Sequence, residues 1–140
     1  TVMGTLERLQ KAVLEYLRSL SDLKYASIYA EGGNNPARAE KACGLQVEIL
    51  SPLPKAASKF AAGPTFSEVE ISLEVCRQNE IARSAPSITT TAEIISRALH
   101  NWIPPIECGY GKVSLAAESP WERKGKESIA IKFNVQSVLL

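Results

Sequence analysis

Three carboxylates, Glu68, Glu70 and Glu74, stand two and four residues apart in one segment of this 140-residue chain. In an extended strand, this spacing places all three side chains on the same face. Such a cluster can bind a cation, or it can supply a general acid and a general base. A solvated strand face that meets basic groups on a neighbouring subunit has the same pattern, and we favour that interpretation.

The single histidine, His100, lies close to Trp102 near the end of a predicted helix. A catalytic histidine needs a nucleophile and an orienting acid, and a zinc-binding histidine needs cysteine or carboxylate partners. No such partner accompanies His100 in the sequence, and the glycine-containing turns do not match nucleotide-binding fingerprints. We therefore expect His100 to interact with the helix dipole or to pack at an interface. We predict no catalytic, cofactor-binding or metal-binding residues and no enzymatic activity.

The composition is that of an ordinary soluble globular protein, with 45% hydrophobic residues, 22% charged residues and a net charge of +1. The length predicts a single domain over residues 1–140. No apolar run reaches the roughly 18 residues of a membrane span, and the charged N-terminal segment does not resemble a signal peptide. The cysteines are odd in number and widely spaced, which predicts reduced, buried thiols: Cys43, Cys76 and Cys108.

The charge pattern does not favour binding to nucleic acid. Four basic side chains have the length to contact phosphate: Lys55, Lys59, Arg77 and Arg83. However, the basic residues are scattered among acidic ones, without aromatic interleaving and without a net basic surplus. A nucleic-acid-binding accessory protein is therefore the weakest of the functional alternatives.

Apolar and polar residues alternate in several segments, which predicts half-buried β-strands. The clearest strand covers residues 66–76, with one face formed by Val69, Ile71, Leu73 and Val75. Similar patterns predict further strands over residues 25–31, 45–50, 111–118 and 128–135, the last two joined by a hairpin loop at residues 122–127.

Two longer helices are predicted to cover one side of this sheet. A leucine-rich stripe predicts the first over residues 4–23, and a capping box, Thr90-x-x-Glu93, predicts the start of the second, which Pro104-Pro105 ends. A short helix is expected at residues 35–43. The predicted fold class is thus α+β, a two-layer sandwich with a mostly antiparallel sheet.

Two segments offer surface for contacts with other chains. Residues 51–65 contain three prolines and predict a long loop, which is either a contact region or a disordered hairpin tip. Residues 77–88 are predicted to be irregular and to expose polar side chains. The candidate subunit or partner contacts in these segments are Lys55, Lys59, Asn79 and Arg83, beside the strand face of Glu68, Glu70 and Glu74. Since an open sheet must protect or use its edges, the pattern favours an assembly module.

The chain resembles the tail-terminator, or tail-completion, family of phage and prophage tail proteins. The resemblance rests on the N-terminal helix, the strand over residues 69–75, the segment from Asn79 to Arg83, and a helix that closes on Leu99-His100-x-Trp102-x-Pro104. The chain departs from the family pattern where Gln78 precedes Asn79, since many relatives have a proline there.

The resemblance implies a structural protein that forms a homo-oligomeric ring, often hexameric, without cofactors or membrane contact. It implies partners in the phage tail tube and the head connector, and a location in the bacterial cytoplasm during assembly and then in the virion tail. The alternative that remains open is a small α+β ligand-binding domain or enzyme of unknown substrate, with a pocket between helices and sheet.

Overall fold

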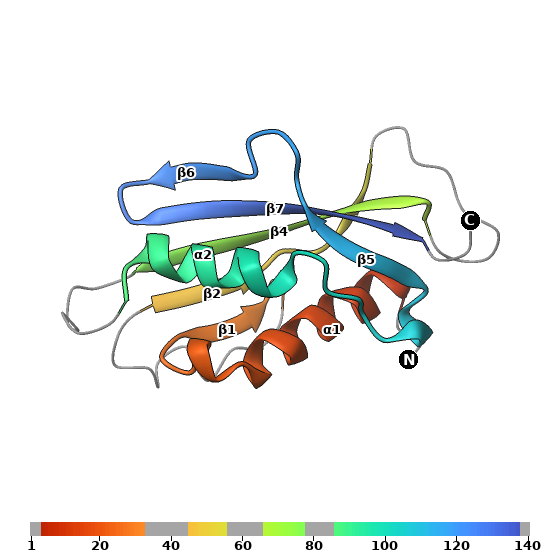
Figure 1. Ribbon diagram of the computed structural model, residues 1–140, viewed down its shortest axis with the longest axis horizontal. Coiled ribbons are helices and arrows are strands. Elements are labelled where there is room, and N and C mark those ends of the chain that lie inside the picture. Colours follow the sequence, from red (N-terminus) through yellow and green to blue (C-terminus); the bar gives the residue numbers. More distant parts are fainter. Residues whose placement is uncertain (1–3, 33–44, 56–65, 78–85, 138–140) are drawn as a thin grey trace.

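The structure is a computed structural model that describes residues 4–32, 45–55, 66–77 and 86–137. Two α-helices, α1 (Thr5–Ser19) and α2 (Ile88–Leu99), lie on the same side of a seven-stranded sheet, as Figure 1 shows. All strand pairs are antiparallel except β1 (Ser27–Ala30) with β2 (Leu45–Ile49). The predicted α+β two-layer sandwich is therefore confirmed.

The sheet is built around its two longest strands, β4 (Glu68–Arg77) and β7 (Ser128–Ser137), which pair along most of their length. Its strand order is β1-β2-β4-β7-β5. Strand β3 (Leu53–Pro54) continues the line of β2 along β4, and β6 (Trp121–Gly125) and β5 (Tyr110–Leu115) pair with different parts of β7. The sheet therefore has β1 at one edge and both β5 and β6 at the other.

The helix-facing side of the sheet follows the predicted alternation. The β4 residues that the pattern assigned to the core are almost completely buried: Val69, Ile71, Leu73 and Val75. Their partners on β7 extend the same apolar layer: Ile129, Ile131, Phe133 and Val135. Burial of one such side chain contributes about 1.5–3 kcal/mol, so this layer is the main source of stability.

Helix α1 follows the predicted apolar stripe and buries Leu9, Val13 and Leu17. Gln10 is also buried, and its side-chain amide donates a 2.8 Å hydrogen bond to the carbonyl of Ile49 at the end of β2. A short 3₁₀ turn, η1 (Ser21–Leu23), then leads into β1.

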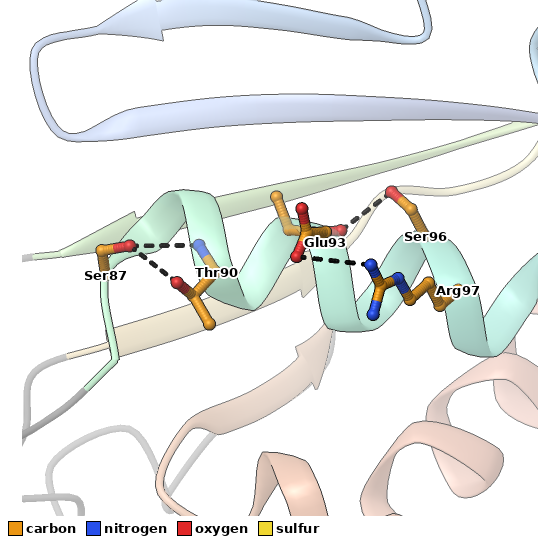
Figure 2. Close-up of polar contacts among 6 residues, drawn as sticks. Ser87, Thr90, Glu93, Ser96 and Arg97 are labelled. Carbon is orange, nitrogen blue, oxygen red and sulfur yellow. Dashed lines mark hydrogen bonds and ion pairs between the residues drawn. The ribbon is translucent and has the colours of Figure 1, made fainter.

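The predicted start of the second long helix is wrong. Helix α2 begins at Ile88, and its N-cap is Ser87, whose Oγ accepts a 3.1 Å hydrogen bond from the Thr90 amide (Figure 2). Glu93 does not complete a capping box with Thr90, and instead lies 3.9 Å from Arg97 one turn later. The extended conformation at Ser87 lets its hydroxyl reach the free amides of the first turn, which explains the earlier start.

The predicted end of α2 is also wrong, because the helix ends at Leu99, before Pro104. His100 has an extended conformation, and Asn101 has a positive φ of 71°. Asparagine tolerates this left-handed conformation better than most residues. The Asn101 amide then donates to the carbonyl of Val113 at 2.7 Å, so pairing with β5 replaces the next helical turn.

Two predicted loops contain strands. Residues 122–127 were expected to form only a hairpin loop, but β6 pairs with β7 there. Strand β6 was not predicted because its charged residues do not alternate with apolar ones. Its first residue, Trp121, attaches it to α2, since Trp121 Nε1 donates a 2.9 Å hydrogen bond to Ser96 Oγ. Within predicted loop 51–65, residues 53–54 form β3, whereas residues 56–65 and predicted helix 35–43 lie outside the described residues.

Candidate assembly surfaces

The second face of the sheet carries the three predicted carboxylates. Glu68, Glu70 and Glu74 are half-buried and alternate with the core residues of β4, so they point away from the two helices. This confirms their shared face. Their partners on β7 are Gln136, Asn134 and Ala130, respectively. We call this polar side of the sheet the open face.

A fourth carboxylate, which the sequence interpretation missed, joins this face. Glu48 on β2 is the register partner of Glu74 on β4, so two like charges lie directly opposite each other. The base nearest in register is Lys132, whose partner on β4 is Ser72, between Glu70 and Glu74 in the strand. Lys132 also lies 4.0 Å from Glu122. Glu122 lies closer to Lys124, at 3.3 Å.

The β1 edge of the sheet is closed by a side chain from α1. The Glu31 amide donates to Ile49 on β2, so the alternating backbone groups of Ile28 point outward. Arg18 donates to the outward Ile28 carbonyl from both Nε and Nη2, at 2.9 and 2.6 Å. Arg18 was not singled out in the sequence because it looked like one of several solvated charges on the helix.

The β5 edge is closed by the segment that follows α2. The Val113 amide donates to the Trp102 carbonyl at 2.8 Å, and the Leu115 amide donates to Nδ1 of His100 at 3.0 Å. His100 therefore acts as a hydrogen-bond acceptor for a strand edge, a contact that the sequence did not predict. The neighbouring β6 edge carries exposed charged side chains, a common protection against strand addition.

The segment Leu99-His100-x-Trp102-x-Pro104 thus forms one structural unit. Leu99 and Pro104 are buried, and the Trp102 ring stacks on Tyr16 of α1 with a centroid distance of 4.5 Å and an interplanar angle of 9°. Trp102 is half-buried, lies beyond the helix end and packs against the hydrophobic core. The motif connects α2, β5 and α1.

The described residues expose three large hydrophobic side chains. Ile103 is 65% exposed and Ile106 is 82% exposed, both in the segment between α2 and β5. Leu53 on β3 is 63% exposed and is the register partner of Glu70, so it lies on the open face. The exposed side chains therefore occupy opposite sides of the sheet.

A polar hollow of about 380 Å³ lies at one end of the open face, beside the irregular register of β5. Its lining includes Glu68, Lys112, Ser114, Asn134 and Gln136. The Asn134 Oδ1 atom is buried and has no hydrogen-bond partner. This arrangement offers hydrogen bonds to a small polar molecule.

Of the four other candidate contacts, one lies within the described residues. Lys55 is half-buried directly after β3, and its amide donates to the carbonyl of Glu68 at 3.2 Å. It therefore lies near the carboxylate face, as the contact hypothesis requires. Lys59, Asn79 and Arg83 lie outside the described residues.

Among the described residues, neither Cys76 nor Cys108 forms a disulfide, but only Cys108 is buried as predicted, because Cys76 is half-buried; Cys43 lies outside the described residues. Cys108 is buried, and this burial, together with the negative charge of Glu107, raises the pKa of its thiol. Within the described ranges, no group of three or more histidine, cysteine or acidic residues is arranged to hold a metal ion. Over the same ranges, neither helix has the length and apolar character needed to cross a membrane.

Comparison with protein-family models found no match, and comparison with curated protein sequences also found none.

Proposed function

We propose that this protein is a structural component of a phage or prophage tail, which self-associates into a ring that caps the tail tube and contacts the head connector. The observation that supports it best is the combination of two partly covered sheet edges, at β1 and β5, with a broad polar face. Arg18 covers β1, and His100 with Trp102 covers β5. A chain with covered edges associates through its faces rather than by adding strands.

The surfaces that remain suit such association. Within the described residues, β2 and β4 place Glu48, Glu68, Glu70 and Glu74 on the open face, and a basic surface on a partner would complement these carboxylates. Ile103, Ile106 and Leu53 add apolar contact area on both sides of the molecule. The resemblance of the segment from Leu99 to Pro104 to tail-terminator proteins supplies the identity of the assembly.

The proposal is tested by measuring assembly state and tube binding together. Native mass spectrometry and sedimentation over a concentration series should reveal a closed oligomer of fixed subunit number. Adding the protein to growing tubes of a phage tail tube protein should shorten the tubes seen by electron microscopy. A strictly monomeric protein at high concentration that does not bind tubes would refute the proposal.

The polar hollow favours a second candidate, a small ligand-binding domain. The unpaired Asn134 Oδ1 and the nearby Lys112 provide an acceptor and a donor for a polar molecule. A thermal-shift screen with amino acids, sugars and nucleosides separates the two functions. A stabilising compound whose effect disappears in Asn134→Leu would favour ligand binding, whereas no stabilisation by any compound would count against it.

A further inference from the structure

The polar hollow at the end of the open face spans three neighbouring strands. In the strand order β4-β7-β5, Glu68 of β4 pairs with Gln136 of β7, and Asn134 of β7 pairs with Ser114 of β5. All four residues line the hollow. Neighbouring strands lie about 4.8 Å apart, so the backbones of β4 and β5 are separated by roughly 10 Å. The volume of about 380 Å³ suits a small molecule, because ligand sites commonly measure roughly 300–1,000 Å³.

A β-bulge in β5 brings Lys112 to this hollow. Tyr110 and Val113 are both buried although they are three positions apart, which regular alternation does not allow. The register shift between them leaves two residues of β5, Gly111 and Lys112, opposite the single residue Gln136 of β7. Because of this extra residue, Lys112 is exposed and lines the hollow, whereas regular alternation from Tyr110 would turn it toward the core. The bulge thus places an ammonium group on the β5 side of the hollow.

The middle and the β4 side of the hollow present acceptors. Glu68 on β4 is half-buried and points away from the helices. On β7, the Oδ1 atom of Asn134 is buried and has no hydrogen-bond partner among the described residues. A buried acceptor without a partner is unfavourable, so a donor that reaches it gains more than it would in water. Rotation of the Asn134 amide about its Cβ–Cγ bond is soft, which lets Oδ1 turn toward such a donor. These two residues favour a cationic donor.

The charges of the lining restrict the class of ligand. Among the described residues, the lining carries one acid, Glu68, and one base, Lys112, on opposite sides of β7. A phosphate or another simple anion would lie beside the Glu68 carboxylate, and a metal cation would lie beside the Lys112 ammonium group, so each would meet a like charge. A neutral sugar would leave both charges without a counter-charge. A molecule with one ammonium and one carboxylate group complements both sides.

We propose that this hollow binds a small zwitterion, of which a free α-amino acid is the simplest kind. The ligand's ammonium group donates to Asn134 Oδ1 and to the Glu68 carboxylate, while its carboxylate accepts from Lys112 and from the Ser114 hydroxyl. The acceptors lie on β4 and β7 and the donors on β5, so one orientation of the ligand satisfies both ends. This assignment rests on ligand binding, the second candidate function, and specifies the class of ligand. It does not depend on ring assembly.

Titrations of the wild-type protein followed by NMR test the ligand class directly. L-serine is the probe, and two derivatives each lack one of its charges, since L-serinamide has no carboxylate and N-acetyl-L-serine has no ammonium group. N-acetyl-L-serine should bind about tenfold more weakly than L-serine, because it leaves the half-buried Glu68 and the buried Asn134 Oδ1 without a cationic donor. L-serinamide should bind about fivefold more weakly, because water screens the exposed Lys112. Equal affinity for all three compounds would overturn the assignment.

Variants that remove one charge assign the two ends of the ligand. In Lys112→Gln, L-serine and L-serinamide should bind with nearly equal affinity, because the residue that distinguishes them is gone. In Glu68→Gln, the preference for L-serine over N-acetyl-L-serine should fall for the same reason. Lys126→Gln is the matched control, since it removes a lysine charge from an exposed position in the turn before β7, at the other end of that strand, and should leave both preferences unchanged. Circular dichroism verifies folding, and the wild-type titrations need no variant.

The location of the bound molecule separates this assignment from ligand binding in general. L-serine should shift the NMR signals of Lys112, Ser114 and the Asn134 side-chain amide. A sugar or nucleoside that shifts these signals where L-serine does not, and whose binding is lost in Asn134→Leu, would overturn the zwitterion while ligand binding stands. The absence of any shift at these residues with all compounds at high concentration would overturn both. L-serine binding whose preferences persist in Lys112→Gln and Glu68→Gln would also overturn the assignment, because the amino acid would then bind elsewhere.

Discussion

Arg18 on α1 donates two hydrogen bonds to the carbonyl of Ile28 on β1, and this pair closes one edge of the sheet. The contact joins a residue of the first helix to the backbone of the first strand, ten positions later in the chain. An edge strand exposes unpaired backbone groups to which another strand can add, and Arg18 occupies one of these groups on the four-residue strand β1.

Replacing Arg18 with alanine should expose this edge. We expect the free energy of unfolding to fall by about 1 kcal/mol, less than the roughly 1.5–3 kcal/mol of hydrogen bonds to charged groups, because Arg18 is exposed to solvent. Urea denaturation measures this loss, and light scattering at high concentration should detect slow association through the uncovered strand. Arg18→Lys keeps the charge but not the paired donors, so it should lie between wild type and alanine. Unchanged stability and scattering in Arg18→Ala would contradict the edge-closing role.

The hydrogen bond from the Leu115 amide to His100 should protect this amide of β5 from hydrogen exchange. In His100→Ala, the Leu115 amide loses its acceptor and should exchange its hydrogen at least several times faster in NMR experiments. The Val113 amide donates to the Trp102 backbone instead, so it should remain protected and serves as an internal control. Equal acceleration at both amides would indicate loosening of the whole segment rather than loss of one contact.

The N-cap of α2 distinguishes the observed helix start from the one predicted by sequence. Ser87→Ala should lower the free energy of unfolding by about 1 kcal/mol, because the Thr90 amide loses its acceptor. Glu93→Gln should change it by less than about 0.5 kcal/mol, because Glu93 only forms an exposed ion pair with Arg97. Chemical denaturation of both variants under identical conditions gives the comparison, and the reverse order would support a cap at Thr90.

Repulsion between the opposed carboxylates Glu48 and Glu74 should lower the free energy of unfolding of the isolated protein. Glu74→Gln removes the repulsion, and we expect a gain of about 0.2–1 kcal/mol at low salt that shrinks as salt is added. Glu127→Gln, an exposed position in the β6–β7 turn, is the control for loss of one negative charge. A loss of stability in Glu74→Gln would mean that Glu74 has a favourable partner on the open face. If the open face binds a basic partner surface, the stabilised variant should assemble less well.

The buried Cys108 thiol predicts a pH effect with a definite sign. Its raised pKa means that the folded protein retains the thiol proton at a pH at which the unfolded chain has lost it. Stability should therefore decrease as the pH rises from the unfolded pKa toward the folded pKa, and Cys108→Ala should reduce this decrease. Thiol labelling near neutral pH should be slower at Cys108 than at the half-buried Cys76. Faster labelling of Cys108 would contradict its burial.

Much of the fold could be predicted because strand and helix periodicities record burial directly. The alternation from Val69 to Val75 identified the central strand, its core face and its outward carboxylates, since side-chain direction in a strand changes at every residue. The stripe through Leu9, Val13 and Leu17 identified α1 for the same reason. Strand β6 was missed because only Trp121 contacts the core, and a single anchor produces no period.

The candidate surfaces were less accessible to sequence interpretation, because they depend on which segments become neighbours. The sequence shows that position 74 is acidic, but not that Glu74 lies opposite Glu48 on β2. In the same way, it does not show that His100 accepts a hydrogen bond from Leu115, or that Arg18 donates to Ile28. In each case the partner belongs to another element. Local chemistry therefore determined the two layers and the polarity of each face. Only the tertiary structure decided which sheet edges are covered, which carboxylates face each other, and on which side of the sheet Leu53 and Ile106 lie. These relationships depend on strand register and on the path of the chain between elements. Both bring together residues that are far apart in the sequence and that no local hydrophobic period connects.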